Sequence, residues 1–482
     1  MNINWKIISP EIAILATSFV LLFVDLFVHR ARSIIFTGIS LAGTIIAILL
    51  TFDNFGYLGN GFSGVILNDY ISFYFKIIFC LGTLLTIFVS ANYVKAEIKC
   101  IGEYYILLFI ATFGMMVMAT AADLITVFLG LEVMSVSLFV LAGIHQDRPR
   151  SREASMKYFL LGAFASAFFI YGVALLFGAY GTTNLIEMSR RINVGSNYSQ
   201  ILSSVGLVLI LVGLGFKVGL APFHTWIPDV YEGSMAPVTA FMSAGPKAAA
   251  FAALFRIFSI FSPVISDNFT TILWILAAVT MTWGNILAIA QKNIKRMLAY
   301  SSIAHAGYVM IAMVAGGQAG MSAGIFYLLA YTLMNIGAFA IVVLFAGKGE
   351  KLERIGDYAG FGIKYPLMGI AMTVFMLSLA GIPSTAGFMG KYKIFVAAID
   401  SGFVWLAVLG VINSLISVWY YIGVVVTMYM MPDAPQKTAL SFSTSIMIAI
   451  FISLLGTLHL GLFPDRWLSL ANLAGMNFNW LR

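Results

Sequence analysis

The sequence predicts an all-α polytopic membrane protein with about fourteen transmembrane helices. Of its 482 residues, 61% are hydrophobic and only 10% are charged, whereas soluble domains are about 45–50% apolar and about 25% charged. The apolar residues form long runs and do not alternate at every second position, which favours helices over an outer-membrane barrel. Because so few polar residues could cover a water-facing surface, we expect a lipid bilayer to surround the chain.

Apolar runs of about 17–25 residues, the length that crosses a bilayer, define the predicted spans. The seventh and twelfth runs contain Pro222 and Pro383. Since proline removes a backbone donor and disrupts a helical hydrogen bond, we expect both of these helices to be broken. The runs lie near residues 10–28, 34–52, 70–92, 104–121, 123–144, 155–180, 202–226, 237–261, 270–290, 299–316, 322–346, 366–399, 403–430 and 443–463.

The distribution of lysine and arginine predicts how these spans are oriented. With the N-terminus outside, fifteen basic residues fall in the odd-numbered, cytoplasmic loops and five fall on the opposite side. This bias agrees with the positive-inside rule and with an even number of spans. We therefore expect both termini on the outer side. The net charge of +7 is then a topology signal, and no basic patch for nucleic acid is predicted.

The remaining seven basic residues lie within the predicted spans, where a charge at the helix centre costs about 2.5–3.5 kcal/mol. Some of them could reach the membrane interface with their charged ends or form structural ion pairs. Such a structural role is favoured for Lys76, whereas for Lys157 and Arg256 a structural role and a functional role carry about equal weight. The seven are Lys76, Lys157, Lys217, Lys247, Arg256, Lys391 and Lys393.

Lys217, Lys247 and Lys391, together with the carboxylate of Glu132, lie near the centres of their spans among glycine, alanine and leucine. A lysine in a partly hydrated cavity can bind and release a proton near neutrality, because burial and a nearby carboxylate shift its pKa in opposite directions. His305 lies about one turn into the tenth span and could relay protons, since imidazole titrates near neutral pH. These residues therefore predict that the protein binds and releases protons within its membrane spans. For His224, beside Pro222, a relay and a helix cap both stay open.

The two broken spans each carry one of these lysines, and Lys217 and Lys391 are 174 residues apart. Paired interrupted helices of this kind indicate inverted repeats with a site in each half. We predict five-helix repeats over 101–262 and 263–431, with additional helices in 1–100 and 432–482. The two cysteines form no CxxC motif and the five histidines are scattered, so no redox cofactor is expected in this chain.

Four stretches resemble the antiporter-like subunits of respiratory complex I, most closely the N type. They are "GFKVGLAPFHTWIPDVYEGSMAPVTAFMSAGPKAAAF", "SSIAHAGYVMI", "YLLAYTLMNIGAFAIVVL" and "LSLAGIPSTAGFMGKYKIF". The resemblance covers residues 100–430, and the span count extends it to the whole chain. A lysine at position 391, where the M type has glutamate, favours the N type. Lys393 is an additional cation beside it.

The resemblance implies a proton-translocating subunit of a bacterial inner membrane that works with the other membrane-arm and peripheral-arm subunits of complex I. Flavin, iron–sulfur clusters and quinone would lie in those partners. By motif, the proton-handling residues fall on Glu132, Lys157, Lys217, Lys247, His305 and Lys391. Two alternatives stay open: a subunit of a multisubunit cation/proton antiporter, and a scaffold whose charges only hold helices together.

Overall fold

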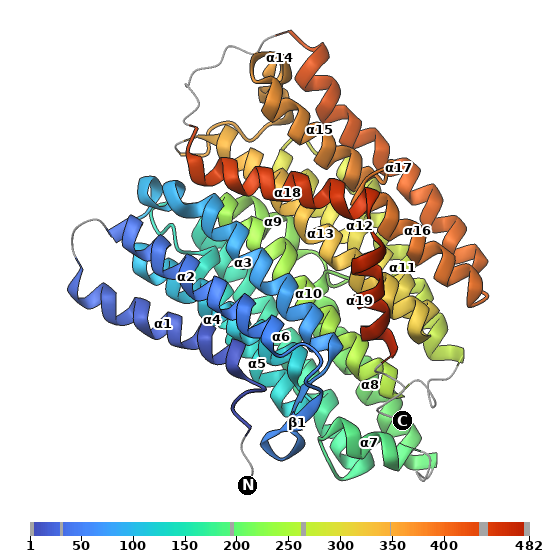
Figure 1. Cartoon of the computed structure of the whole chain (residues 1–482). Coiled ribbons are helices and arrows are strands. Elements are labelled where there is room, and N and C mark those ends of the chain that lie inside the picture. Colours follow the sequence, from blue (N-terminus) through green and yellow to red (C-terminus); the bar gives the residue numbers. More distant parts are fainter. Residues whose placement is uncertain are drawn as a thin grey trace.

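The computed structural model describes residues 4–28, 32–192, 197–261, 267–347, 349–432 and 442–476, which form a bundle of long helices (Figure 1). Within these residues, 13 helices are long and apolar enough to cross a membrane. The two shorter helices α15 and α16 together occupy the twelfth predicted span, on either side of the expected break. The fold class, a polytopic helical membrane protein with interrupted helices, is therefore confirmed.

The elements follow the predicted spans in order. The first part of the chain contains α1 Ser9–Phe27, α2 Arg32–Asp53, β1 Gly59–Gly61, η1 Phe62–Gly64, β2 Ile66–Asn68, α3 Tyr70–Glu97, α4 Ile101–Thr120, α5 Leu124–Ala142, α6 Pro149–Tyr180, α7 Leu185–Arg191, α8 Asn197–Val218, α9 Trp226–Gly233 and α10 Ala236–Phe261. The second part contains α11 Asp267–Ile289, α12 Ile294–Ala315, α13 Gly317–Ala346, η3 Ile355–Tyr358, α14 Phe361–Lys364, α15 Pro366–Ala380, α16 Ala386–Asp400, α17 Val404–Met430, α18 Thr444–Leu462 and α19 Asp465–Met476.

The structure departs from the sequence-based prediction at the polar ends of the helices. Helices α6 and α12 begin about five residues earlier than their apolar runs, because their first turns are polar and carry no hydrophobic signal. The two three-residue strands β1 and β2 pair antiparallel in the loop before α3, an exception to the all-α prediction. This hairpin and α7 lie at one end of the bundle, whereas α14 lies at the opposite end (Figure 1).

Glycines allow two helix pairs to approach closely, one in each predicted repeat. A Cβ atom on Gly114 of α4 would lie 2.6 Å from the backbone nitrogen of Met134 on α5. A Cβ atom on Gly284 of α11 would lie 2.6 Å from the backbone nitrogen of Ala304 on α12. Small residues at membrane helix contacts permit such approach. The repeat boundaries and the inverted relation stay predictions, which this correspondence supports.

Helices α10, α12 and α13 form the centre of the bundle, and their spans are almost entirely buried. The peripheral helices expose large apolar side chains, including Phe164 on α6 and Trp405 and Trp419 on α17. Such surfaces suit contact with lipid or with partner helices. Lys247 and His305 therefore lie on the helices that are most deeply enclosed.

Two of the seven cations form buried structural ion pairs. Lys76 Nζ lies 2.8 Å from Glu11 Oε1, which confirms the structural interpretation of this lysine. Arg256 donates to both carboxylate oxygens of Asp69, at 2.8 and 3.1 Å, and to the carbonyl oxygen of Ala119 at 2.7 Å. Arg256 is fully buried. These three acceptors satisfy its guanidinium inside the bundle, which favours the structural interpretation of Arg256 over a functional one.

Candidate functional site

The seventh span is interrupted between Val218, where α8 ends, and Trp226, where α9 begins. Gly219 takes a left-handed φ of +84°, and the backbone nitrogens of Gly219 and Leu220 both donate to the carbonyl of Gly215. The indole nitrogen of Trp226 donates to the carbonyl oxygen of Phe216 at 2.9 Å. The backbone groups that the break releases thus find protein partners, as a membrane interior requires.

Lys217 lies in the last turn of α8, and its ammonium faces aromatic rings. Lys217 Nζ is 4.8 Å from the ring centre of Phe139, 4.9 Å from that of Tyr158 and 5.5 Å from that of Phe216. Within the described residues, Nζ has no hydrogen-bond acceptor. The lysine is buried, so cation–π attraction is the main local stabilisation of its charge.

Glu132 on α5 is half-buried and accepts a hydrogen bond from the hydroxyl of Ser166 on α6. This partner comes from another helix and is a serine rather than a cation. Among the described residues, Lys217 Nζ has no hydrogen-bond partner, so the structure shows no direct contact between Glu132 and Lys217.

Unlike Lys217, Lys247 and Lys391, Lys157 is partly exposed and forms ion pairs. Its side chain is 42% exposed, and Nζ lies 2.8 Å from both Glu153 and Asp229. Burial opposes the ionisation of Asp229, but hydrogen bonds from Lys157 and Arg296 outweigh that effect and lower its pKa. Lys157 thus joins α6 to α9 at their polar ends, and its part in proton translocation stays a prediction.

Lys247 follows Pro246 in the middle of α10 and is buried against α12. Its Nζ donates to the carbonyl oxygen of Ser302 at 2.6 Å and also contacts the hydroxyl of the same residue. The ring centre of Tyr331 on α13 lies 5.9 Å from Nζ. These contacts connect Lys247 to α12, which carries His305, and to α13.

Both ring nitrogens of His305 bond to tyrosine hydroxyls. Nδ1 bonds to Tyr327, and Nε2 lies 3.0 Å from the hydroxyl of Tyr421. Tyr421 itself donates to the Ser301 hydroxyl at 2.7 Å, so it accepts from His305 Nε2. This direction places a proton on Nε2.

Lys391 on α16 is bound by the end of the preceding half-helix. Its Nζ donates to the carbonyl oxygens of Leu379 and Ala380, each at 3.0 Å, and to the hydroxyl of Ser414 at 2.9 Å. The last carbonyls of a helix lack intrahelical partners and carry partial negative charge. Lys391 is buried, whereas Lys393 is only half-buried. The break and Lys391 therefore form one site.

Two tyrosines fill the space between these groups. The ring centre of Tyr331 lies 5.0 Å from that of His305, and the ring centre of Tyr308 lies 5.7 Å from it. Tyr308 also lies 4.7 Å from Lys391 Nζ. The row therefore runs from Lys247 through Tyr331, His305 and Tyr308 to Lys391.

Tyr308, Tyr327 and Tyr331 were not predicted from the sequence. Tyr308 lies three residues after His305, and Tyr327 lies four residues before Tyr331, so helical spacing could have suggested them. His224 is buried, and its Nδ1 has no partner among the described residues. No side-chain hydrogen bond caps the start of α9. Within the described part of the chain, no three His, Cys, Asp or Glu side chains form a group that could hold a metal ion.

The fold and this site define a class: polytopic membrane proteins with broken helices and intramembrane lysines, the arrangement typical of ion-translocating proteins. Comparisons with known proteins narrow this class. The family model described as "NADH:quinone oxidoreductase/Mrp antiporter, TM" matches residues 121–417. The chain is 45% identical over 473 residues to NADH-quinone oxidoreductase subunit N of Trichlorobacter lovleyi, covering 98% of this chain and 97% of the relative.

A second relative is subunit N 1 of Solibacter usitatus, 42% identical over 97% of this chain and 96% of the relative. A chain of respiratory complex I from Thermus thermophilus superposes with a TM-score of 0.82 at 36% identity, covering 96% of this chain and 99% of that one. The Mrp complex of Dietzia shares the fold, with a TM-score of 0.82 at 22% identity over 97% of each chain. The chain belongs to the NADH-quinone oxidoreductase subunit N family.

Proposed function

We propose that this chain is a proton-translocating membrane subunit of an NADH–quinone oxidoreductase, and that it moves protons through its buried lysines. The observation that carries the proposal is the row of polar and aromatic groups from Lys247 through His305 to Lys391. Groups that can hold a proton lie along the centre of the bundle, and the relatives named subunit N supply the biological setting.

In this mechanism Glu132 controls the proton on Lys217. Because no acceptor among the described residues binds Lys217 Nζ, the stability of its ammonium depends on charges farther away, and we assign Glu132 as one of them. A change that moves or neutralises Glu132 alters that stability. The proton then passes through Lys247 and His305 to Lys391, from which it leaves to the outside.

The chain supplies the path, and partner subunits supply the driving reaction. Quinone reduction in those partners, with flavin and iron–sulfur clusters, drives conformational or electrostatic change in this subunit. The assembly lies in a bacterial inner membrane, surrounded by lipid, with both termini of this chain on the periplasmic side. The excess of basic residues in the odd-numbered loops supports that orientation.

The direct test measures NADH-driven proton uptake in inverted membrane vesicles. Lys217→Ala and Lys391→Ala should each abolish or greatly reduce uptake while the complex still assembles. Lys393→Ala is the matched control, because Lys393 lies on the same helix but is only half-buried. Normal uptake in both the Lys217 and Lys391 variants would falsify the assigned roles.

The second candidate is a subunit of a multisubunit cation/proton antiporter. The matched family model names Mrp antiporters as well, and the Mrp complex of Dietzia shares the fold. This candidate predicts sodium- or potassium-dependent proton flux without NADH. The proteins that co-purify in mild detergent separate the two: flavin and iron–sulfur proteins support the oxidoreductase, and small membrane subunits alone support the antiporter.

A further inference from the structure

A buried carboxylate outside the row of lysines joins several helices at the end of the bundle that carries α14. This carboxylate belongs to Glu350, in the loop that follows α13, and its side chain is only 3% exposed. We propose that Glu350 is a positioning residue, which fixes α10 against α12 and thereby holds Lys247 in contact with Ser302. The inference rests on the proposed function, because it assigns Glu350 a part in the same proton path.

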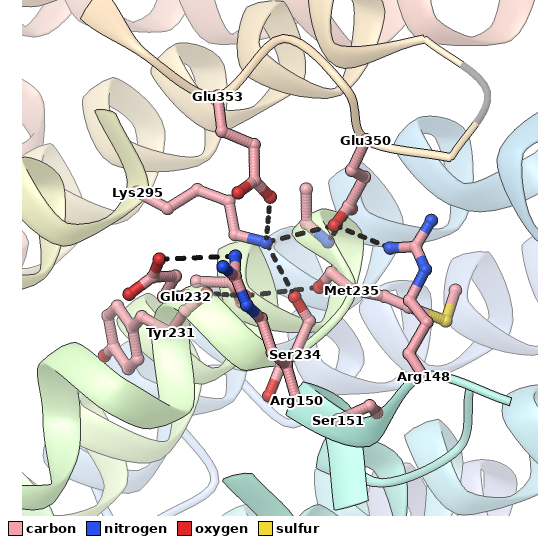
Figure 2. Close-up of polar contacts among 12 residues, drawn as sticks. Arg148, Arg150, Ser151, Tyr231, Glu232, Ser234, Met235, Lys295, Glu350 and Glu353 are labelled. Atoms are coloured by element: carbon pink, nitrogen blue, oxygen red, sulfur yellow. Dashed lines mark hydrogen bonds and ion pairs between the residues drawn. The ribbon is translucent and has the colours of Figure 1, made fainter. Parts of the chain in front are cut away.

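Residues from four parts of the chain donate hydrogen bonds to the Glu350 carboxylate, and Figure 2 shows two of these donors, Arg148 and Lys295. Arg148, just before α6, donates at 3.0 Å, and Lys295 in the first turn of α12 donates at 3.1 Å. The backbone nitrogen of Ala236, the first residue of α10, donates at 2.7 Å, and the hydroxyl of Tyr93 on α3 donates as well. One side chain therefore connects α3, α6, α10 and α12.

These contacts act at the starts of the two helices that carry the Lys247–Ser302 contact. Lys247 lies eleven residues beyond Ala236, which is about 16 Å along α10, and Ser302 lies seven residues beyond Lys295, about 10 Å along α12. Lys295 also donates to the carbonyl oxygen of Ser234, between α9 and α10, at 2.9 Å. Since helices transmit displacement as nearly rigid bodies, the position of their first turns sets the spacing at Lys247.

Glu350 belongs to a network of ion pairs in which both cations contact a second carboxylate. Lys295 is fully buried and also pairs with Glu353 at 3.2 Å, while Arg148 also pairs with Glu97 at 3.1 Å. Burial opposes the ionisation of Glu350, but Lys295, the hydrogen bonds of Tyr93 and Ala236, and Arg148 outweigh that effect and lower its pKa. The residue is therefore a carboxylate at neutral pH, and it pairs with both Lys295 and Arg148.

The backbone of Glu350 also indicates that its position matters. Its φ is +48°, in the left-handed region that residues other than glycine seldom occupy. Such a conformation persists only where surrounding contacts determine it strongly. Here the conformation directs the carboxylate inward, to Ala236 and Lys295.

The experiment uses the whole complex in inverted vesicles and compares Glu350→Gln with Glu103→Gln, an exposed glutamate in the first turn of α4. We expect proton uptake per NADH oxidised to fall about tenfold in Glu350→Gln, with assembly retained, because small displacements of positioned groups reduce rates steeply. Glu103→Gln should leave uptake unchanged. If Glu350 acts through Lys247, adding Glu350→Gln to Lys247→Ala should cause no further loss.

A second variant covers the case in which Glu350→Gln fails to assemble. Glu350→Gln combined with Lys295→Met removes one charge of each sign, and Arg148 keeps its ion pair with Glu97. We expect this pair to assemble and to show the same reduced uptake. Normal uptake in this pair, or additive losses with Lys247→Ala, overturns the positioning role. Normal uptake in Lys217→Ala and Lys391→Ala would instead refute the proposed function itself, so the two failures are distinguishable.

Discussion

The ammonium of Lys391 lies 3.0 Å from the carbonyl oxygen of Ala380, the last residue of α15. The lysine and its acceptor therefore lie on opposite sides of the same helix break. The interruption releases the carbonyls that bind the ammonium, so a buried cation is tolerated without a carboxylate partner. This relationship explains why the proline-containing break and the intramembrane lysine occur together.

The Ser414 hydroxyl is the side-chain partner of Lys391, and its removal tests this site. A hydrogen bond to a charged group contributes about 1.5–3 kcal/mol, so Ser414→Ala should slow NADH-driven proton uptake by about tenfold or more. The complex should still assemble, because the two backbone acceptors remain. The control is Ser453→Ala on α18, a buried serine whose hydroxyl has no partner among the described residues. Equal uptake in the two variants would contradict the prediction.

Glu132 and Lys217 together separate a transport role from a scaffold role. Glu132→Gln combined with Lys217→Met removes one charge of each sign, so a scaffold should tolerate the change. We expect the assembled complex to lose NADH-driven proton uptake, because the lysine that binds the proton and the carboxylate that controls it are both gone. Immunoblotting of the purified complex checks assembly. Full uptake in the double variant would support the scaffold.

The Tyr327 hydroxyl orients His305 through its hydrogen bond with Nδ1. Tyr327→Phe removes this partner and leaves a buried imidazole nitrogen without its hydrogen bond, which costs about 1 kcal/mol, so we expect proton uptake to fall about fivefold. Tyr74→Phe is the control, since Tyr74 is buried on α3 and its hydroxyl has no partner among the described residues. An unchanged rate of proton uptake in Tyr327→Phe would show that this hydroxyl is not needed for proton transfer.

Arg256 and Asp69 should matter for stability and assembly more than for transport. Arg256→Ala leaves Asp69 and the Ala119 carbonyl without their partner, and breaking a buried pair of this kind costs about 3–5 kcal/mol. We expect a lower thermal midpoint of the purified complex and less assembled subunit. Arg466→Ala, at an exposed position at the start of α19, should change neither quantity. A wild-type midpoint for Arg256→Ala would contradict this.

The pH dependence of stability provides a test of Glu350. Its pKa in the folded protein is lowered below the usual value of 4.5, so its stabilising effect is present above that usual value and is lost as pH falls through the lower folded value. Wild-type and Glu350→Gln complexes should therefore differ most in thermal midpoint at neutral pH. The difference should shrink as the pH falls below about 4.5. A difference independent of pH would show that ionised Glu350 is not its cause.

The site was only partly predictable from the sequence. Lys217, Lys247 and Lys391 could be singled out because a cation in an apolar run is rare and unfavourable. Tyr308, Tyr327 and Tyr331 gave no such signal, because tyrosine is common in membrane helices. Glu350 gave none either, since it lies in a charged loop that the topology already explained.

The sequence by itself determined the class, the spans and the two breaks, because hydrophobic length and proline chemistry act locally along the chain. Only the tertiary structure decided which groups each buried cation contacts. Lys76 and Arg256 form ion pairs with carboxylates that are distant in the sequence. The ammonium of Lys217 faces aromatic rings, and that of Lys391 binds carbonyl oxygens at the end of α15. The role of a buried charge depends on the groups that it contacts, and these groups come together only when the helices pack.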